Sequence, residues 1–67
     1  MIFDRQVWDI AKMMLMVYGR DATYEAGSIA DEMVKLGDLD GADQWLRVTE
    51  AVDELQQNMT HQGRLLH

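Results

Sequence analysis

The stretch Leu36-Gly37-Asp38-Leu39-Asp40-Gly41-Ala42 separates two long segments with helical periodicity. Gly37 suits the left-handed conformation in which many helices end. Asp38 suits the position just before a helix, because its carboxylate can accept hydrogen bonds from the open amides of the first turn. The stretch therefore predicts a helix that ends at residue 36, a tight turn, and a helix that begins at residue 39.

A second break of the same kind, Gly19-Arg20-Asp21, lies nearer the N-terminus. The chain has no Pro and is rich in Ala, Met, Leu, Gln and Glu, which favour helices. We expect three helices, at about residues 5–18, 22–36 and 39–58, with Asp4, Asp21 and Asp38 as their N-caps. Short connections make sequential helices antiparallel neighbours, so the predicted fold is all-α, a compact three-helix unit.

Each predicted helix has one apolar face at a spacing of 3.6 residues per turn. The predicted core residues are Val7, Ala11, Met14, Leu15 and Tyr18, then Ala22, Ala26, Ile29, Ala30, Met33 and Leu36, and finally Gly41, Trp45, Val48, Val52, Leu55 and Met59. The indoles of Trp8 and Trp45 are expected to anchor the core.

The length of 67 residues predicts one domain, residues 1–59, followed by a frayed tail at residues 60–67. There is no Cys, so neither a disulfide nor a Cys-ligated zinc site can stabilise the chain. Chains of this size bury a small core, so stability has to come from packing alone or from a partner subunit. Self-association as a homodimer is therefore one expectation.

The charge is acidic and unevenly distributed. The formal net charge is −6, and residues 21–54 contain ten acidic and two basic side chains. This balance argues against direct binding to nucleic acid or to an anionic membrane, because both require Lys and Arg. The longest apolar run, residues 13–18, is too short to span a bilayer, and the N-terminus lacks a signal-peptide pattern. We expect a cytoplasmic protein.

Residues suited to catalysis or metal binding are sparse. Ser28 is the only Ser and has no His near it in sequence, and His61 and His67 are the only histidines. The acidic segment around Asp38 departs from a calcium loop, since the first and last ligand positions fall on Leu36 and Arg47. No catalytic residue, metal, cofactor or small-molecule substrate is predicted, and the chain is not expected to be an enzyme. A concave pocket lined by carboxylates with perturbed pKa values, or a bound ion, would revive that alternative.

The first predicted helix is apolar nearly all round between Met13 and Tyr18, because Met13 and Met16 lie away from its core face. Such a helix is either buried on both sides or contacts a partner, and Met adapts well to partner surfaces. Burial under the third helix or the tail is the alternative to partner contact. The residues predicted to bind a partner are Met13, Met16, Val17, Leu39, Leu46, Asp43, Glu50, Asp53 and Glu54.

Two resemblances rest on the central motif. Residues 24–55, with Ala26, Ala30, Leu36–Ala42 and Trp45-Leu46, resemble a tetratricopeptide-type helix pair, although there is one unit and no closing Pro. Residues 7–56, with their Gly-Asp-x-x-Gly-x-x-x-Trp centre, resemble a family of short bacterial three-helix proteins of unknown function. That family implies a small cytosolic helical unit and no activity.

Two functions are therefore expected. The first is a small acidic module that binds a protein partner or itself through the Met-rich face of the helix at 5–18, with the acidic helices selecting basic partners. The alternative is an inhibitor or anti-defence protein whose carboxylates imitate phosphates and occupy a basic groove.

Overall fold

The computed structural model describes the backbone of residues 4–65 and the side chains of residues 5–58. Its elements are α1 (Asp4–Tyr18), the 3-10 turn η1 (Gly19–Asp21), α2 (Ala22–Lys35) and α3 (Leu39–Leu65). All regular structure in this described part of the chain is helical, so the prediction of an all-α chain is confirmed.

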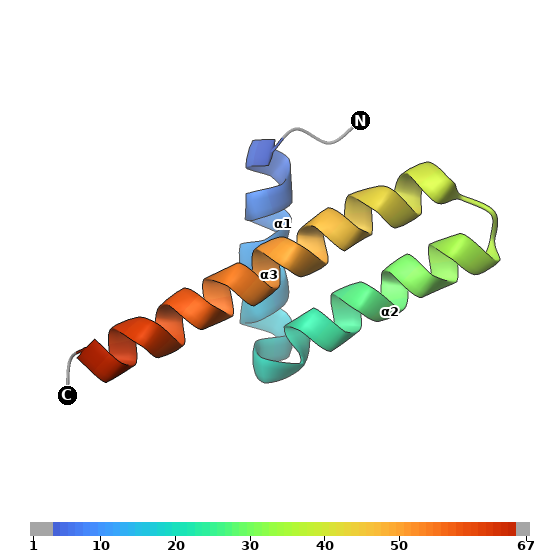
Figure 1. The fold of residues 1–67 in the computed structure, drawn as a ribbon. Helices are drawn as coiled ribbons and strands as arrows, with labels where there is room; N and C mark the ends of the chain where they lie inside the picture. Colours follow the sequence, from blue (N-terminus) through green and yellow to red (C-terminus); the bar gives the residue numbers. More distant parts are fainter. Residues whose placement is uncertain (1–3, 66–67) are drawn as a thin grey trace.

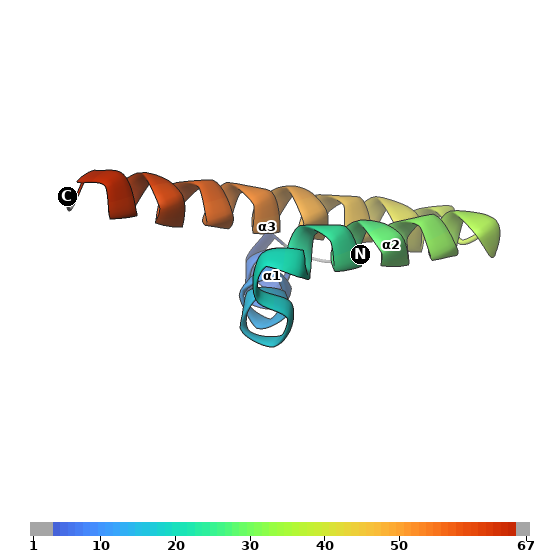
Figure 2. The same ribbon diagram turned by 90° about the horizontal axis from the view of Figure 1, so that it is seen from below.

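The helices are arranged in two layers. α2 and α3 lie side by side and antiparallel, and the turn at residues 36–38 joins them (Figure 1). α1 lies on one side of this pair and crosses it (Figure 2). The antiparallel prediction therefore holds for α2 and α3, but α1 departs from it. The three residues of η1, with Gly19 at φ 56°, turn the chain directly from α1 into α2 and leave α1 across the pair.

Small residues make the crossing close. Ala11, Ala22 and Ala26 are fully buried, so the three helices approach one another with little side chain between them. Val48 and Val52 of α3 are the largest fully buried side chains in the described part. The buried core is Val7, Ala11, Met14, Ala22, Ala26, Val48, Ala51 and Val52, with Trp8, Ile10, Leu15, Ile29, Trp45 and Leu55 packed against it.

The turn between α2 and α3 matches its prediction. Gly37 has φ 80°, and the amides of Gly37 and Asp38 donate to the carbonyls of Val34 and Met33 at 3.0 and 2.9 Å. These bonds satisfy carbonyls that the end of a helix leaves open. Asp38 caps α3, since its Oδ1 accepts from the amide of Gly41 at 2.9 Å.

The other two predicted caps differ. Asp21 precedes α2, but its side chain makes no capping hydrogen bond, because the residue still belongs to the 3-10 turn and not to an extended lead-in. Asp4 is already the first residue of α1, and its side chain lies outside those described.

Several predicted core positions are wrong. Tyr18 is 43% exposed and Leu36 is 76% exposed, because each lies where its helix ends and no neighbouring helix covers it. Conversely, Ala42 and Ala51 are buried although the predicted core faces did not include them. The backbone of residues 60–65, predicted as a frayed tail, continues α3, and the side chain of Met59 lies outside those described.

Candidate functional site

The side of α1 that faces away from the other helices carries a contiguous apolar surface. Met13 is 51% exposed, Met16 87% and Val17 65%. We call these three residues the α1 outer face. Burial of Met13 and Met16 under α3 or the tail was the alternative to partner contact, and the structure leaves both residues exposed.

The position of this surface follows from the helical repeat. Val7, Ala11 and Met14 turn inward and are buried. Met16 follows Val7 by nine residues, about two and a half turns, so its side chain leaves the helix on the opposite side. The packing that buries one side of α1 therefore exposes the α1 outer face.

Charged groups of both signs border the α1 outer face. Asp9 lies one turn before Met13, Lys12 lies one turn before Met16, and Arg20 follows in η1. All three are exposed, and none forms an ion pair with another residue of the described part. The border is therefore free to pair with charges on an approaching surface.

The remaining predicted partner-binding residues form a second surface, on α3. All six are exposed, and we call them the α3 acidic face: Leu39, Asp43, Leu46, Glu50, Asp53 and Glu54. Asp43 pairs with Arg47 at 3.2 Å, as the i,i+4 spacing predicts. Asp53 accepts from Nε2 of Gln57 at 3.0 Å. Glu50 and Glu54 have no cation within ion-pair distance among the described residues.

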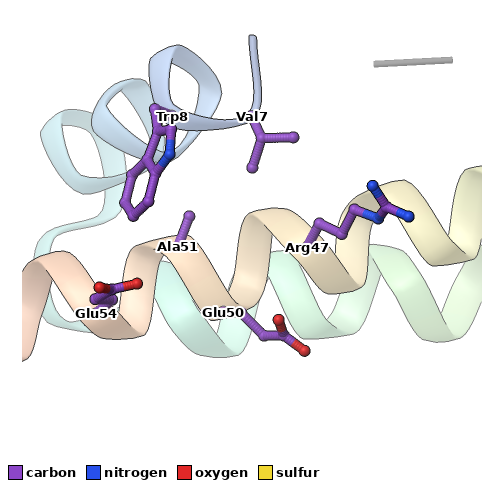
Figure 3. Close-up of a pocket in the computed structure, with 6 residues that line it drawn as sticks. All are labelled: Val7, Trp8, Arg47, Glu50, Ala51 and Glu54. Atoms are coloured by element: carbon purple, nitrogen blue, oxygen red, sulfur yellow. The ribbon is translucent and has the colours of Figure 1, made fainter. Parts of the chain in front are cut away.

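The structure does not bring the two surfaces together. Ala51 points from α3 toward Trp8 of α1 (Figure 3). Leu46 and Asp53 lie about 140° and 160° from Ala51 around α3, at about 100° per residue. α1 itself occupies one side of the α2–α3 pair (Figure 2). The nine predicted residues thus divide into an apolar surface on the outer side of α1 and an acidic surface on α3, of which Glu50 and Glu54 border α1.

A shallow recess of about 280 Å³ lies where α1 meets α3, and sequence reasoning missed it. Its lining is Val7, Trp8, Arg47, Glu50, Ala51 and Glu54 (Figure 3). The indole and the two glutamates offer contacts of the kind that a cationic side chain makes. The i,i+3 and i,i+4 spacing of the α3 residues indicates in the sequence that they share one helix face. The angle at which α1 crosses α3 and places Trp8 above them cannot be read from the sequence.

The described residues offer little for catalysis. No three of their His, Cys, Asp or Glu side chains come close enough together to hold a metal ion. Ser28 lies exposed on α2. The side chains of His61 and His67 lie outside those described. Within the part of the chain that the structure describes, none of the helices has the length and hydrophobicity that crossing a bilayer requires.

Comparison of the chain with protein-family models, with curated proteins and with solved structures gives no significant match. The family resemblances drawn from the central motif therefore stay predictions.

Proposed function

We propose that this chain is a small cytoplasmic protein–protein interaction module, built as a three-helix unit, that binds through the α1 outer face. The observation that carries the proposal is the exposure of Met16, Val17 and Met13 on one side of a helix whose opposite side buries Val7, Ala11 and Met14. Contiguous apolar surface of this kind costs free energy in water and is typical of binding sites.

The chemistry of these three residues suits a protein partner. Two of them are methionines, whose unbranched, polarizable side chains adapt to the shape of the surface they meet. The surrounding charges, Asp9 and Lys12, are those of a polar rim around an apolar centre. A helix face with this composition would pack against a helix or a groove of the partner.

The α3 acidic face has a different role in this proposal. It lies away from the α1 outer face, so the two would not contact the same small epitope. Its carboxylates contribute a negative field that acts over distance and favours the approach of basic partners. Leu39 and Leu46 are the exposed apolar side chains of this face, and they lie outside the proposed contact.

Mimicry of nucleic acid by the α3 acidic face is the second candidate. The exposed carboxylates of Asp43, Glu50, Asp53 and Glu54 on one helix favour it. The row is interrupted, however, by Leu46 and by Arg47, which neutralises Asp43. Binding to a basic nucleic-acid-binding protein that collapses with salt would support mimicry, and binding that persists at about 1 M salt would exclude it.

Affinity capture with matched variants tests the leading proposal. The immobilised chain, its Met16→Lys variant and its Leu39→Lys variant are exposed to the same cell extract. Both variants place one lysine at an exposed apolar position, on the α1 outer face or on the α3 acidic face. We expect a partner retained by the unmodified chain and by Leu39→Lys but lost from Met16→Lys. Retention that is insensitive to Met16→Lys would contradict the proposal.

A further inference from the structure

The α1 outer face differs from the rest of the molecule in being complementary to itself. A two-fold contact places the same patch on both sides, so a patch of one sign repels its own copy. Residues 4–20 contain two acidic and three basic side chains, whereas residues 21–54 contain ten acidic and two basic. Among the described surfaces, the side of α1 is the one where two copies of this acidic chain can meet without strong repulsion.

The order of charges along α1 specifies how the copies would meet. Met13 and Met16 are the centre of the face, and Asp9 lies about 8 Å of helix before the midpoint between them. Arg20 lies two residues beyond the other end of α1, in η1. In an antiparallel contact with the two-fold axis at that midpoint, Met13 lies on Met16 of the second copy. Asp9 then lies near the end of α1 of the second copy, where the long side chain of Arg20, just beyond that end, can reach it.

This arrangement also directs the like charges apart. α1 projects from one side of the α2–α3 pair (Figure 2). Leu46 and Asp53 lie on the side of α3 away from Ala51, which points toward α1 (Figure 3), so a contact through α1 keeps these parts of the α3 acidic face outside the interface. Antiparallel helices oppose their macrodipoles favourably as well. Asp9 and Arg20, which have no ion-pair partner within the described chain, gain one in the dimer.

We infer that the occupant of the α1 outer face is a second copy of this chain, packed antiparallel through Met13 and Met16 with an Asp9–Arg20 ion pair at each end. The inference rests on the proposed function, since it names the partner of the same surface. It is more specific than that function, because another protein could occupy the face instead.

Sedimentation equilibrium of the purified full chain tests the inference. We expect the mass to rise with concentration toward twice 7.7 kDa. Asp9→Arg and Arg20→Asp should each raise the dissociation constant about tenfold, because each turns two ion pairs into repulsions. The double variant restores both ion pairs with their charges exchanged. Its dissociation constant should return to within about threefold of that of the unmodified chain.

Two lysine variants locate the contact. Met16→Lys should abolish association, and Leu39→Lys, the matched change on the α3 acidic face, should leave it intact. A chain that stays monomeric at all concentrations, a dimer that survives Met16→Lys, or a double variant that fails to recover would each overturn the inference. A monomer that still captures a different protein in a Met16-dependent way would overturn the dimer and leave the proposed function standing. Loss of both self-association and Met16-dependent capture would overturn the dimer and the proposed function together.

Discussion

Asp38 and Gly41 act as a pair at the start of α3. The carboxylate of Asp38 accepts a hydrogen bond from the amide of Gly41 at 2.9 Å. A Cβ placed on Gly41 would lie 2.5 Å from Oδ2 of Asp38. Gly41 does not have a positive φ, so a side chain at this position is disfavoured by the space that the capping carboxylate occupies and not by backbone conformation.

The effect of Gly41→Ala on stability should therefore depend on whether Asp38 is present. Asp38→Ala should lower the free energy of unfolding by about 1 kcal/mol through loss of the cap. Gly41→Ala gains about 1 kcal/mol of helix propensity but displaces the capping carboxylate, so its net effect should stay within about 0.5 kcal/mol. In the Asp38→Ala background, the same substitution should stabilise by about 1 kcal/mol. Urea unfolding of the four proteins measures the coupling, and additive effects would contradict it.

At the scale of the elements, Gln56 connects α3 to the junction between α1 and α2. Its Nε2 donates to the carbonyl of Gly19 at 3.1 Å, and its Oε1 accepts from the hydroxyl of Thr23 at 3.0 Å. The first bond reaches Gly19, the first residue after α1, and the second reaches the first turn of α2. One side chain therefore helps to hold the turn that sets α1 across the helix pair.

Gln56→Ala should accordingly lower the free energy of unfolding by about 1–2 kcal/mol, because it removes two hydrogen bonds between elements. Gln57→Ala is the matched control, since the amide of Gln57 bonds to Asp53 within α3 itself. The control should change stability by less than about 0.5 kcal/mol. Thermal unfolding followed by circular dichroism measures both, and equal effects would show that the Gln56 contacts carry no special weight.

The approach of α2 to α3 yields another prediction. A Cβ on Gly27 would lie 4.0 Å from Cγ2 of Thr49, an ordinary van der Waals contact. Gly27→Ala should therefore stabilise the protein by about 0.5–1 kcal/mol through helix propensity. Gly27→Leu should destabilise it, because the longer side chain must displace Thr49. Chemical unfolding of both variants gives the sign of each change in the free energy of unfolding. If Gly27→Ala destabilised the protein, α2 and α3 would have to approach more closely than they do in the structure.

At the scale of the whole molecule, the fold is elongated. Its radius of gyration is 12.8 Å and its extents are 46 × 22 × 16 Å, whereas a compact chain of this length has a radius of gyration of about 11 Å. α3 runs past the end of α2 on the side of the chain's C-terminus (Figure 1). A small core and a long exposed helix leave modest stability, which association would raise.

The melting temperature should therefore depend on concentration. If two copies pack through the α1 outer face, mass action stabilises the folded state, and the melting temperature should rise by several degrees between about 10 µM and about 1 mM. Met16→Lys should remove this dependence, and Leu39→Lys should retain it. Differential scanning calorimetry measures the effect, and a melting temperature independent of concentration in the unmodified chain would contradict it.

Local signals determined much of the fold. Gly37 and Asp38 predicted the turn and the start of α3, because a left-handed glycine and a capping carboxylate act on groups within a few residues. The alternation of Val7, Ala11 and Met14 with Met13 and Met16 likewise identified which side of α1 turns inward. These features depend on the helical repeat and on bonds between near neighbours, so the sequence alone specifies them.

Other features depend on how the helices meet. Three features follow from the crossing of α1 over the α2–α3 pair. They are the exposure of Leu36, the recess in which Trp8 lies above Glu50 and Glu54, and the separation of Met13 and Met16 from Leu46. That crossing is set by the backbone of η1 and by close contact among buried alanines such as Ala22 and Ala26. The helical repeat marks these alanines as inward-facing but does not say which residues of the other helices they meet. The sequence by itself therefore determined the helices and their inward faces. Only the tertiary structure decided that the apolar and acidic surfaces lie apart, because relative helix placement depends on contacts between residues distant in the chain.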